Sequence, residues 1–181
     1  MASWSTIARR IRVPLGFGFA VVYLWLAQPA LFSLVVGAGL MVSGLLVRGL
    51  ASGHVQKNQE LTTSGPYAYT RNPLYLGSCI LAAGAAVAAR SWWIVAGMVV
   101  MFTVIYLPVI RSEEAYLREH FPDFVEYAGA VPRLWPRFTA FRGRTGAFSW
   151  DLYRRHHEYN ATVGAAGIIA VLAAKMWWFS R

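Results

Sequence analysis

Four long stretches of this chain contain no charged side chain, and they constrain its fold more than any other feature. The stretches are 13–47, 72–89, 91–110 and 159–174, and apolar residues dominate each of them. A helix that crosses a bilayer needs about 20 mostly apolar residues, with roughly 17–25 as the usual range. The sequence therefore predicts an all-α, polytopic membrane protein, and it excludes both a disordered chain and an ordinary soluble domain.

The stretch 13–47 is too long for a single span, and Gln28-Pro29 marks a break inside it. Proline disfavours helical backbone in the residue before it and has no N–H to donate. We therefore expect about five transmembrane helices, near 13–28, 30–49, 74–89, 92–110 and 160–179. Small residues in the third helix would permit close helix contact, and Trp92-Trp93 are typical interface anchors.

Positive charge outweighs negative charge, with 17 Lys and Arg against 8 Asp and Glu. In a soluble chain this excess would indicate nucleic-acid binding. Here fourteen of the seventeen basic residues lie in the N-terminus, 48–71 and 111–155, between the apolar stretches. By the positive-inside rule these segments face the cytoplasm. We expect no nucleic-acid partner, a first span that is retained rather than cleaved as a signal peptide, and one domain over 1–181.

Two of the predicted cytoplasmic segments carry more special residues than a connection requires. The first contains Gly65-Pro66-Tyr67-Ala68-Tyr69-Thr70-Arg71-Asn72-Pro73-Leu74-Tyr75-Leu76-Gly77, and the second contains Glu113-Glu114-Ala115-Tyr116-Leu117 followed by Val131-Pro132-Arg133 and Pro136. The two motifs, in this order and with a helical hairpin between them, resemble the isoprenylcysteine carboxyl methyltransferases and related bacterial and phospholipid methyltransferases. The resemblance covers residues 48–137 and leaves the helix near 160–179 as an extra C-terminal element.

The resemblance implies that S-adenosylmethionine binds at the cytoplasmic membrane face and that the methyl acceptor is lipid-like or of prenylcysteine type. The implied cofactor contacts are Gln56, Gln59, Glu60, Leu61, Thr62, Tyr67, Asn72, Pro73, Leu74, Tyr75 and Glu113, to which we add Arg71 from the chemistry of its side chain. A carboxylate such as Glu113 can bind an ammonium, and aromatic faces suit a sulfonium or a purine. Arg71 offers a bidentate partner for a carboxylate. The expected location is a bacterial inner membrane, and the positive-inside rule places the N-terminus in the cytoplasm.

The chain departs from the prenylcysteine enzymes at three points. Asn72 stands where they have His, and Val109 stands where they place a substrate-contacting Arg, although Arg111 is near. The chain also continues into Arg154-Arg155-His156-His157-Glu158 and a further span. We expect Arg111, Arg154 and Arg155 to attract an anionic head group of the acceptor. The acceptor would reach the site sideways from the bilayer, beside the cytoplasmic ends of the third and fourth spans.

Several of these residues also have plainer interpretations. Arg71 can be a juxtamembrane charge that meets lipid phosphate, and the tyrosines can belong to an aromatic belt. Glu113 and Glu114 can pair with nearby arginines at helical spacing, which is the interpretation we favour for Glu114. Adjacent residues such as His156 and His157 point about 100° apart on a helix, so we expect no metal site.

The sequence assigns no catalytic residue. A carboxylate acceptor is already deprotonated at neutral pH, whereas an amine must first lose a proton, for which Glu114, His156 and His157 are the candidate bases. Two other functions stay open. One is a non-catalytic membrane scaffold or lipid-binding protein that retains the fold. The other, a small transporter or channel subunit, is weaker, because it would carry ionisable residues inside its spans and 13–47, 72–89 and 91–110 have none.

Overall fold

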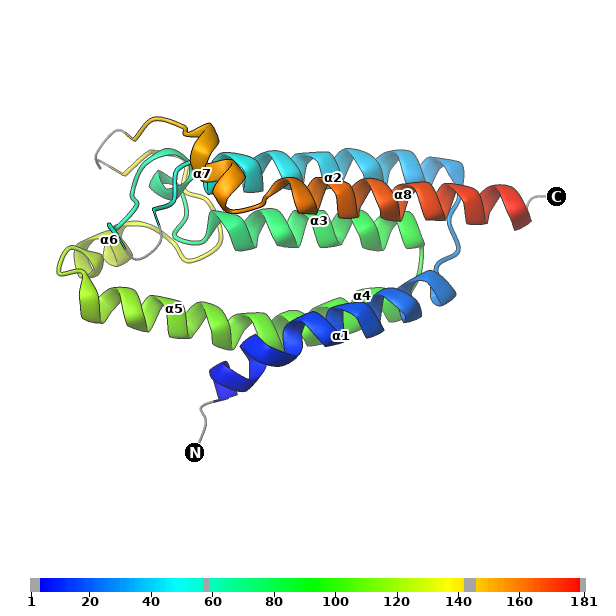
Figure 1. Cartoon of the computed structure of the whole chain (residues 1–181), viewed down its shortest axis with the longest axis horizontal. Coiled ribbons are helices and arrows are strands. Elements are labelled where there is room, and N and C mark those ends of the chain that lie inside the picture. The colour runs from blue at the N-terminus through cyan, green and yellow to red at the C-terminus, as the bar shows by residue number, and fades with distance from the viewer. Residues whose placement is uncertain (1–3, 57–58, 142–145, 180–181) are drawn as a thin grey trace.

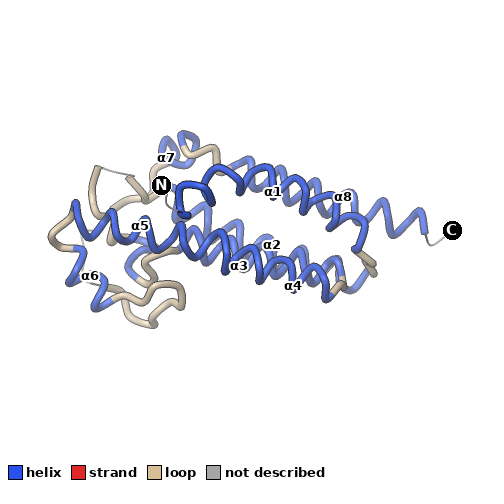
Figure 2. The backbone as a smooth tube through the Cα atoms, turned by 90° about the horizontal axis from the view of Figure 1, so that it is seen from below, coloured by secondary structure: helices blue, strands red, loops and turns tan. Residues whose placement is uncertain are grey.

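The computed structural model describes residues 4–56, 59–141 and 146–179, and all regular structure in this part of the chain is helical, as predicted. The long helices lie along a common axis in two layers (Figures 1 and 2). One layer holds α2 (Leu31–Ser52), α3 (Pro73–Ala89) and α8 (Tyr159–Phe179). The other holds α1 (Trp4–Leu26) beside a continuous helix made of α4 (Trp92–Met101), the π-helical turn η2 (Phe102–Tyr106) and α5 (Leu107–His120).

The predicted break at Gln28-Pro29 is confirmed, because α1 ends at Leu26 and α2 begins at Leu31. Lys175 of α8 closes the C-terminal end of α1. Its ammonium donates to the carbonyls of Leu24, Trp25 and Ala27 at 2.7, 3.1 and 2.7 Å. These carbonyls belong to a helix terminus that carries partial negative charge, so the cation both satisfies and stabilises them.

The layer of α2 and α3 is held together by glycines, as the small residues of the third span predicted. An added Cβ at Gly37 would lie 2.6 Å from the carbonyl oxygen of Gly84, and one at Gly44 would lie 2.7 Å from that of Gly77. The two backbones therefore touch at two levels, which only glycine allows. Above the Gly44–Gly77 level the side chain of Arg48 lies against α3.

Three helices in the described part of the chain are long and apolar enough to cross a bilayer, namely Leu31–Ser52, Trp92–His120 and Tyr159–Phe179. Pro14–Leu26 and Pro73–Ala89 are shorter apolar helices, so the full count of five spans stays a prediction. Large apolar side chains such as Phe17, Phe32 and Val163 are exposed on these helices. Such a surface is suited to lipid rather than to water, and the chain is an integral membrane protein.

The last helix packs on the same protomer, beside α2. Leu172 and Ala165 of α8 are buried in one apolar core with Leu34 and Met41 of α2. A left-handed residue, His157 (φ 52°), separates α7 (Trp150–Arg155) from α8. The short elements η1 (Gly65–Ala68), α6 (Phe124–Ala130) and α7 gather at one end of the molecule, on the left in Figure 1. Both motif segments thus meet at that end.

Candidate functional site

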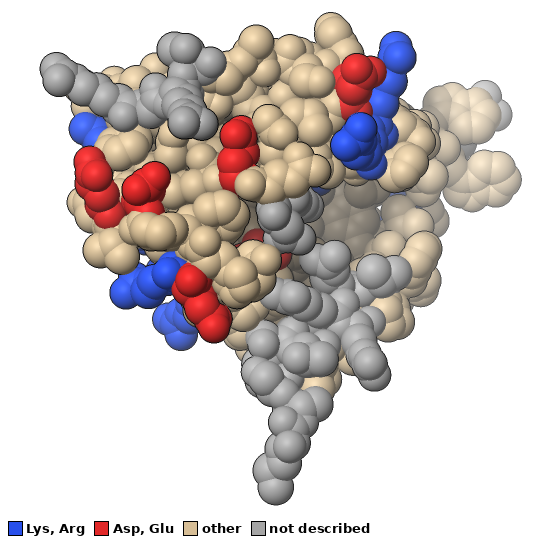
Figure 3. Space-filling model, turned by 60° about the vertical axis from the view of Figure 1, so that its left-hand side comes forward, with Lys and Arg blue, Asp and Glu red and all other residues tan. Residues whose placement is uncertain are grey.

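The polar end of the molecule contains a cavity of about 840 Å³, which lies between the two layers where the motif segments meet. Acidic and basic side chains reach the surface at this end of the molecule (Figure 3). The cavity is lined by residues of α2, α3, η2, α5, α6, the two motif segments and the C-terminal segment: Arg48, Ser52, Val55, Gln56, Glu60, Leu61, Thr62, Tyr67, Arg71, Asn72, Leu74, Tyr75, Ser78, Tyr106, Glu113, Glu114, Tyr116, Leu117, Phe124, Tyr127, His156 and Glu158.

Glu114 joins the two motifs at one side of the cavity. Its Oε1 accepts a hydrogen bond from Nδ2 of Asn72 at 3.0 Å, and its Oε2 accepts from Nε of Arg133 at 2.9 Å. Arg71 completes the cluster as an ion pair, with Nε 3.3 Å from Oε1. That buried Nε has no hydrogen-bond acceptor among the described residues. The carboxylate of Glu114 is 8% exposed, so it is stable there only because cations and an amide surround it.

Backbone contacts then fix the first motif against the second. The hydroxyl of Tyr127 donates to the carbonyl of Tyr67 at 2.7 Å, and the N–H of Arg71 donates to the carbonyl of Pro132 at 2.9 Å. Burial raises the pKa of both Tyr67 and Tyr127 above the ordinary tyrosine value, so their hydroxyls stay protonated at neutral pH. The motif loops thus form one rigid wall of the cavity.

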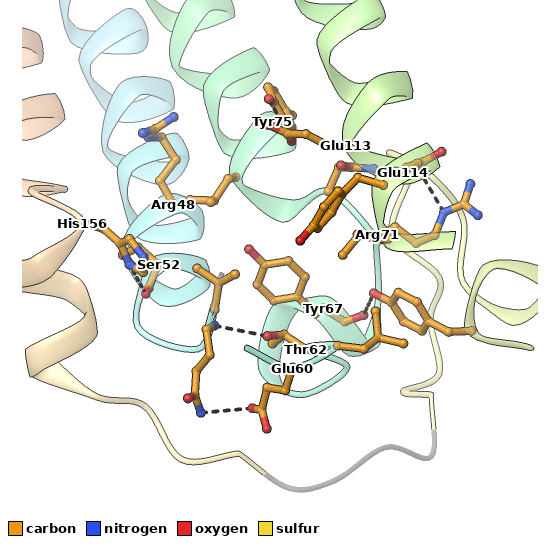
Figure 4. A pocket seen from close by; sticks show the side chains of 18 of the residues that line it. Arg48, Ser52, Glu60, Thr62, Tyr67, Arg71, Tyr75, Glu113, Glu114 and His156 are labelled. Carbon is orange, nitrogen blue, oxygen red and sulfur yellow. Dashed lines mark hydrogen bonds and ion pairs between the residues drawn. The ribbon is translucent and has the colours of Figure 1, made fainter. Parts of the chain in front are cut away.

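Glu113 lies on the same helix as Glu114 but faces the cavity. Its Oε2 accepts a hydrogen bond from the hydroxyl of Tyr75 at 3.1 Å, and no cation lies within ion-pair distance of it among the described residues. Figure 4 shows Glu113 and Tyr75 at the upper side of the cavity and Tyr67 near its centre. The cavity therefore presents an uncompensated carboxylate beside aromatic rings.

The opposite side of the cavity is built by residues that the sequence analysis did not single out as cofactor or substrate contacts. Arg48 of α2 forms a two-point ion pair with Glu158, with Nε–Oε1 at 2.5 Å and Nη2–Oε2 at 3.0 Å, and its Nη1 donates to Ser78 of α3. Next to this pair a ring nitrogen, Nδ1 of His156, lies 3.1 Å from the carbonyl oxygen of Ser52. In the sequence, the one signal for this ion pair is that Arg48 directly follows the apolar stretch 13–47 and Glu158 directly precedes the stretch 159–174.

Ten of the twelve predicted cofactor contacts line the cavity. The two exceptions are Gln59, which is exposed outside it, and Pro73, which is buried in the first turn of α3. Arg111, Arg154 and Arg155, the predicted head-group contacts, are exposed and do not line it. Their roles stay predictions.

The three candidate bases have different surroundings. The carboxylate of Glu114 contacts Asn72, Arg71 and Arg133 from the two motifs. These contacts replace the expected pairing with an arginine one turn away on its own helix. His157 is exposed and contacts the hydroxyl of Tyr159, whereas His156 lines the cavity. No group of three His, Cys, Asp or Glu side chains among the described residues is placed to hold a metal ion.

Comparison with known proteins adds three findings. The family model for phospholipid methyltransferases matches residues 30–123. The chain is 33% identical over 159 residues to the cobalt-zinc-cadmium resistance protein CzcN of Cupriavidus metallidurans, which covers 87% of this chain and 71% of that protein. It is 36% identical over 90 residues to the nickel-cobalt-cadmium resistance protein NccN of Alcaligenes xylosoxydans xylosoxydans, half of this chain and 42% of that protein. No solved structure matches the chain.

Proposed function

Because the chain belongs to the phospholipid methyltransferase family, we propose that it is an S-adenosylmethionine-dependent methyltransferase of the membrane, acting on a lipid-like or prenylcysteine-type acceptor. The observation that supports this most directly is Glu113, a carboxylate that has no ion pair among the described residues and faces a cavity lined by both motifs. A half-buried acid of this kind is suited to a cationic ligand. The same family membership makes methyl transfer the first activity to test.

The residues of the cavity fit the cofactor in size and charge. A volume of about 840 Å³ lies within the range of small-molecule sites. Glu113 would bind the ammonium of the cofactor, and the rings of Tyr67 and Tyr75 would lie against its sulfonium or adenine. The buried Nε of Arg71, which lacks a hydrogen-bond acceptor among the described residues, would add positive charge for its carboxylate. When bound, S-adenosylmethionine supplies an activated methyl group.

The work left to the protein is mostly positioning. Holding two reactants in line can contribute roughly 7–11 kcal/mol to lowering a barrier. The rigid wall formed by Asn72, Glu114 and Arg133 would fix the cofactor end of the cavity. An acceptor carboxylate requires no base, whereas an amine would need one. For an amine, His156 is the candidate in the better position, since a proton on Nδ1 directed at Ser52 leaves Nε2 unprotonated in the neutral ring.

The acceptor would enter from the lipid, between α3 and the helix that contains η2 and α5. Tyr75 of α3 and Tyr106 of η2 both line the cavity, and their ring centroids lie 6.3 Å apart across this gap. Irregular structure at membrane depth is tolerated where it lines a cavity, and π-helical turns often mark functional positions. The polar end would face the cytoplasm, because it carries most of the basic residues, in the inner membrane of a bacterium.

Calorimetric titration of the detergent-solubilised protein with S-adenosylhomocysteine tests the proposal. The enzyme should bind this product of methyl transfer in a saturable manner, whereas a scaffold that only retains the fold should give no binding heat. A methylation assay then compares an acceptor that carries an apolar tail with its water-soluble analogue. The lipidated acceptor should be methylated much faster. Equal rates on both would contradict access from the bilayer.

The names of both relatives refer to resistance to metals, with cobalt and cadmium in both. We propose that, if this chain serves the same purpose, it does so by methylating a component of the membrane. A strain that lacks the gene should then regain metal tolerance with the wild-type protein and stay sensitive with Glu113→Gln. Full tolerance with this variant would mean that resistance does not depend on methyl transfer.

A further inference from the structure

Arg48 is placed where a charged side chain is costly. It belongs to α2, one of the helices apolar enough to span a membrane, and its side chain is 25% exposed. A charged side chain that is mostly shielded from water is costly unless it is paired. Arg48 lines the cavity on the side away from the Glu114 cluster, and Figure 4 shows it opposite Arg71. The charge of Arg48 at this position therefore indicates a functional role.

Glu158 explains how Arg48 can remain charged there. The buried carboxylate of Glu158 is 8% exposed and meets the guanidinium at two points, so each charge compensates the other. Glu158 is supplied by the C-terminal segment, outside the residues that match the family model. The left-handed backbone of His157 and the contact of His156 with Ser52 hold this segment against α2. The C-terminal segment thus adds Glu158 and His156 to a side of the cavity whose other residues, Arg48, Ser52 and Ser78, lie within the matched core.

The contacts with Glu158 and Ser78 do not use every N–H group of the Arg48 guanidinium. An arginine has five N–H groups, and the contacts of Arg48 with Glu158 and Ser78 engage three of them, which leaves one N–H on Nη1 and one on Nη2. The Nη1–Nη2 edge of a guanidinium can bind a carboxylate or a phosphate with two parallel hydrogen bonds. Arg71, the other cation of the lining, is held by Glu114 and the carbonyl of Ala128.

We propose that Arg48, oriented by Glu158 and Ser78, is the site that binds an oxyanion of the methyl acceptor. The acceptor would therefore carry a carboxylate or a phosphate next to its apolar tail. This inference rests on the proposed methyltransferase function, and it adds the charge of the acceptor and the residues that recognise it. Glu158 does not contact the acceptor: it accepts from Arg48 and lowers the net positive charge that the acceptor meets.

The experiment uses the full chain in neutral detergent, saturated with S-adenosylhomocysteine. Apparent Kd values are taken from the rise in Tm with probe concentration. One arm compares oleate with methyl oleate, and the other compares dioleoyl phosphatidic acid with dioleoylglycerol, so the two arms separate a carboxylate from a phosphate. The wild type should bind the anionic probe of at least one arm about tenfold or more tightly than its neutral partner.

Three variants separate binding from structural support. Arg48→Gln with Glu158→Gln removes both charges together, leaves no unpaired buried charge, and should abolish the preference for the anionic probe. Glu158→Gln alone should bind the anion more tightly than the wild type, because it removes a negative charge beside the fork. Arg118→Gln is the matched control, since Arg118 is exposed on α5 outside the cavity, and it should behave as the wild type does.

Two results would overturn the proposal: an unchanged anion preference in the double variant, or anion binding by Glu158→Gln that is no tighter than in the wild type. The second measurement stands even if the double variant does not fold. Failure of the proposed function looks different, because S-adenosylhomocysteine would then not raise the Tm of the wild type at all, whether or not the anionic probes do.

Discussion

Glu113 and Glu114 are neighbours on α5, and their carboxylates have opposite surroundings. Glu114 contacts Asn72, Arg71 and Arg133, whereas Glu113 accepts one hydrogen bond from Tyr75 and faces the cavity. Successive side chains on a helix point about 100° apart. One acid can therefore hold the two motifs together while the next is presented to a ligand. Charge removal at the two positions should accordingly have different effects.

Glu113→Gln should weaken binding of S-adenosylhomocysteine by about tenfold or more, because it removes a charge-assisted hydrogen bond worth about 1.5–3 kcal/mol. Titration calorimetry of wild type and variant measures the change, and the Tm without ligand should stay within about 2 °C, since Glu113 has no ion pair to lose among the described residues. Glu119→Gln, an exposed position on the same helix, is the control. Unchanged affinity in Glu113→Gln would refute the assignment of this carboxylate.

Glu114→Gln should instead destabilise the fold. Removing the buried carboxylate leaves Arg71 and Arg133 facing each other without compensation, and breaking a buried pair typically costs about 3–5 kcal/mol. Thermal unfolding in detergent should show a clear fall in Tm relative to the wild type. Replacing Arg133, which is 42% exposed, should cost less, because water can take over part of its role. A larger loss at Arg133 than at Glu114 would contradict the described order of burial.

Gly44→Ala should lower stability, because its Cβ would lie 2.6 Å from the backbone nitrogen of Leu81 and force α2 away from α3. Overpacking of this kind costs typically about 1–3 kcal/mol. Gly39 on the same helix is the matched control, since an added Cβ there meets nothing within 4 Å. Gly39→Ala should be neutral or stabilising by about 0.5–1 kcal/mol. Equal Tm values for the two variants would show that the helices do not depend on this contact.

Lys175→Met should loosen the C-terminal end of α1, because three carbonyls lose their donor. A cation at a helix C-terminus contributes about 0.3–1 kcal/mol and up to about 2 kcal/mol when partly buried. Hydrogen exchange of the amides in 21–28 should become faster in this variant, whereas Lys175→Arg, which keeps the charge, should change it less. Exchange that is equally slow in all three proteins would exclude a role for Lys175 in closing the helix.

Much of the helical architecture could be predicted from local signals. Gln28-Pro29 interrupts an apolar stretch, and proline acts on the residues next to it wherever they lie in the fold. The glycines of α3 likewise indicate close packing through their size alone. The motif segment 65–77 and the pair Glu113-Glu114 are each contiguous, so their shared cavity required only that two segments meet at one end of the molecule. Local chemistry was sufficient for these features.

The partners of the charged side chains could not be predicted, because they are selected by tertiary structure. Arg48 and Glu158 lie 110 residues apart, and Glu114 lies 42 residues from Asn72. Helical spacing predicted that Glu114 pairs with an arginine one turn away on its own helix. Because its carboxylate is buried, it pairs instead with cations from other segments. The extent of α5 was also underestimated. The apolar stretch ends at Ile110, but the helix continues to His120, supported by packing of Leu117 near Phe124.

The π-helical turn Phe102–Tyr106 stores one extra residue within a helix whose two halves face different neighbours. If the same residues wound as a regular α-helix, α5 would be rotated by about 100° relative to α4, which is the angle of one residue. A deletion of one residue inside 102–106 would therefore let the turn relax and keep both halves in phase. A deletion inside 107–112 would advance the phase, so that Glu114 took the direction of Glu113 and Ala115 that of Glu114. A change in length is therefore expected to be tolerated within 102–106. The same change within 107–112 would put the methyl group of Ala115 where the carboxylate of Glu114 lies.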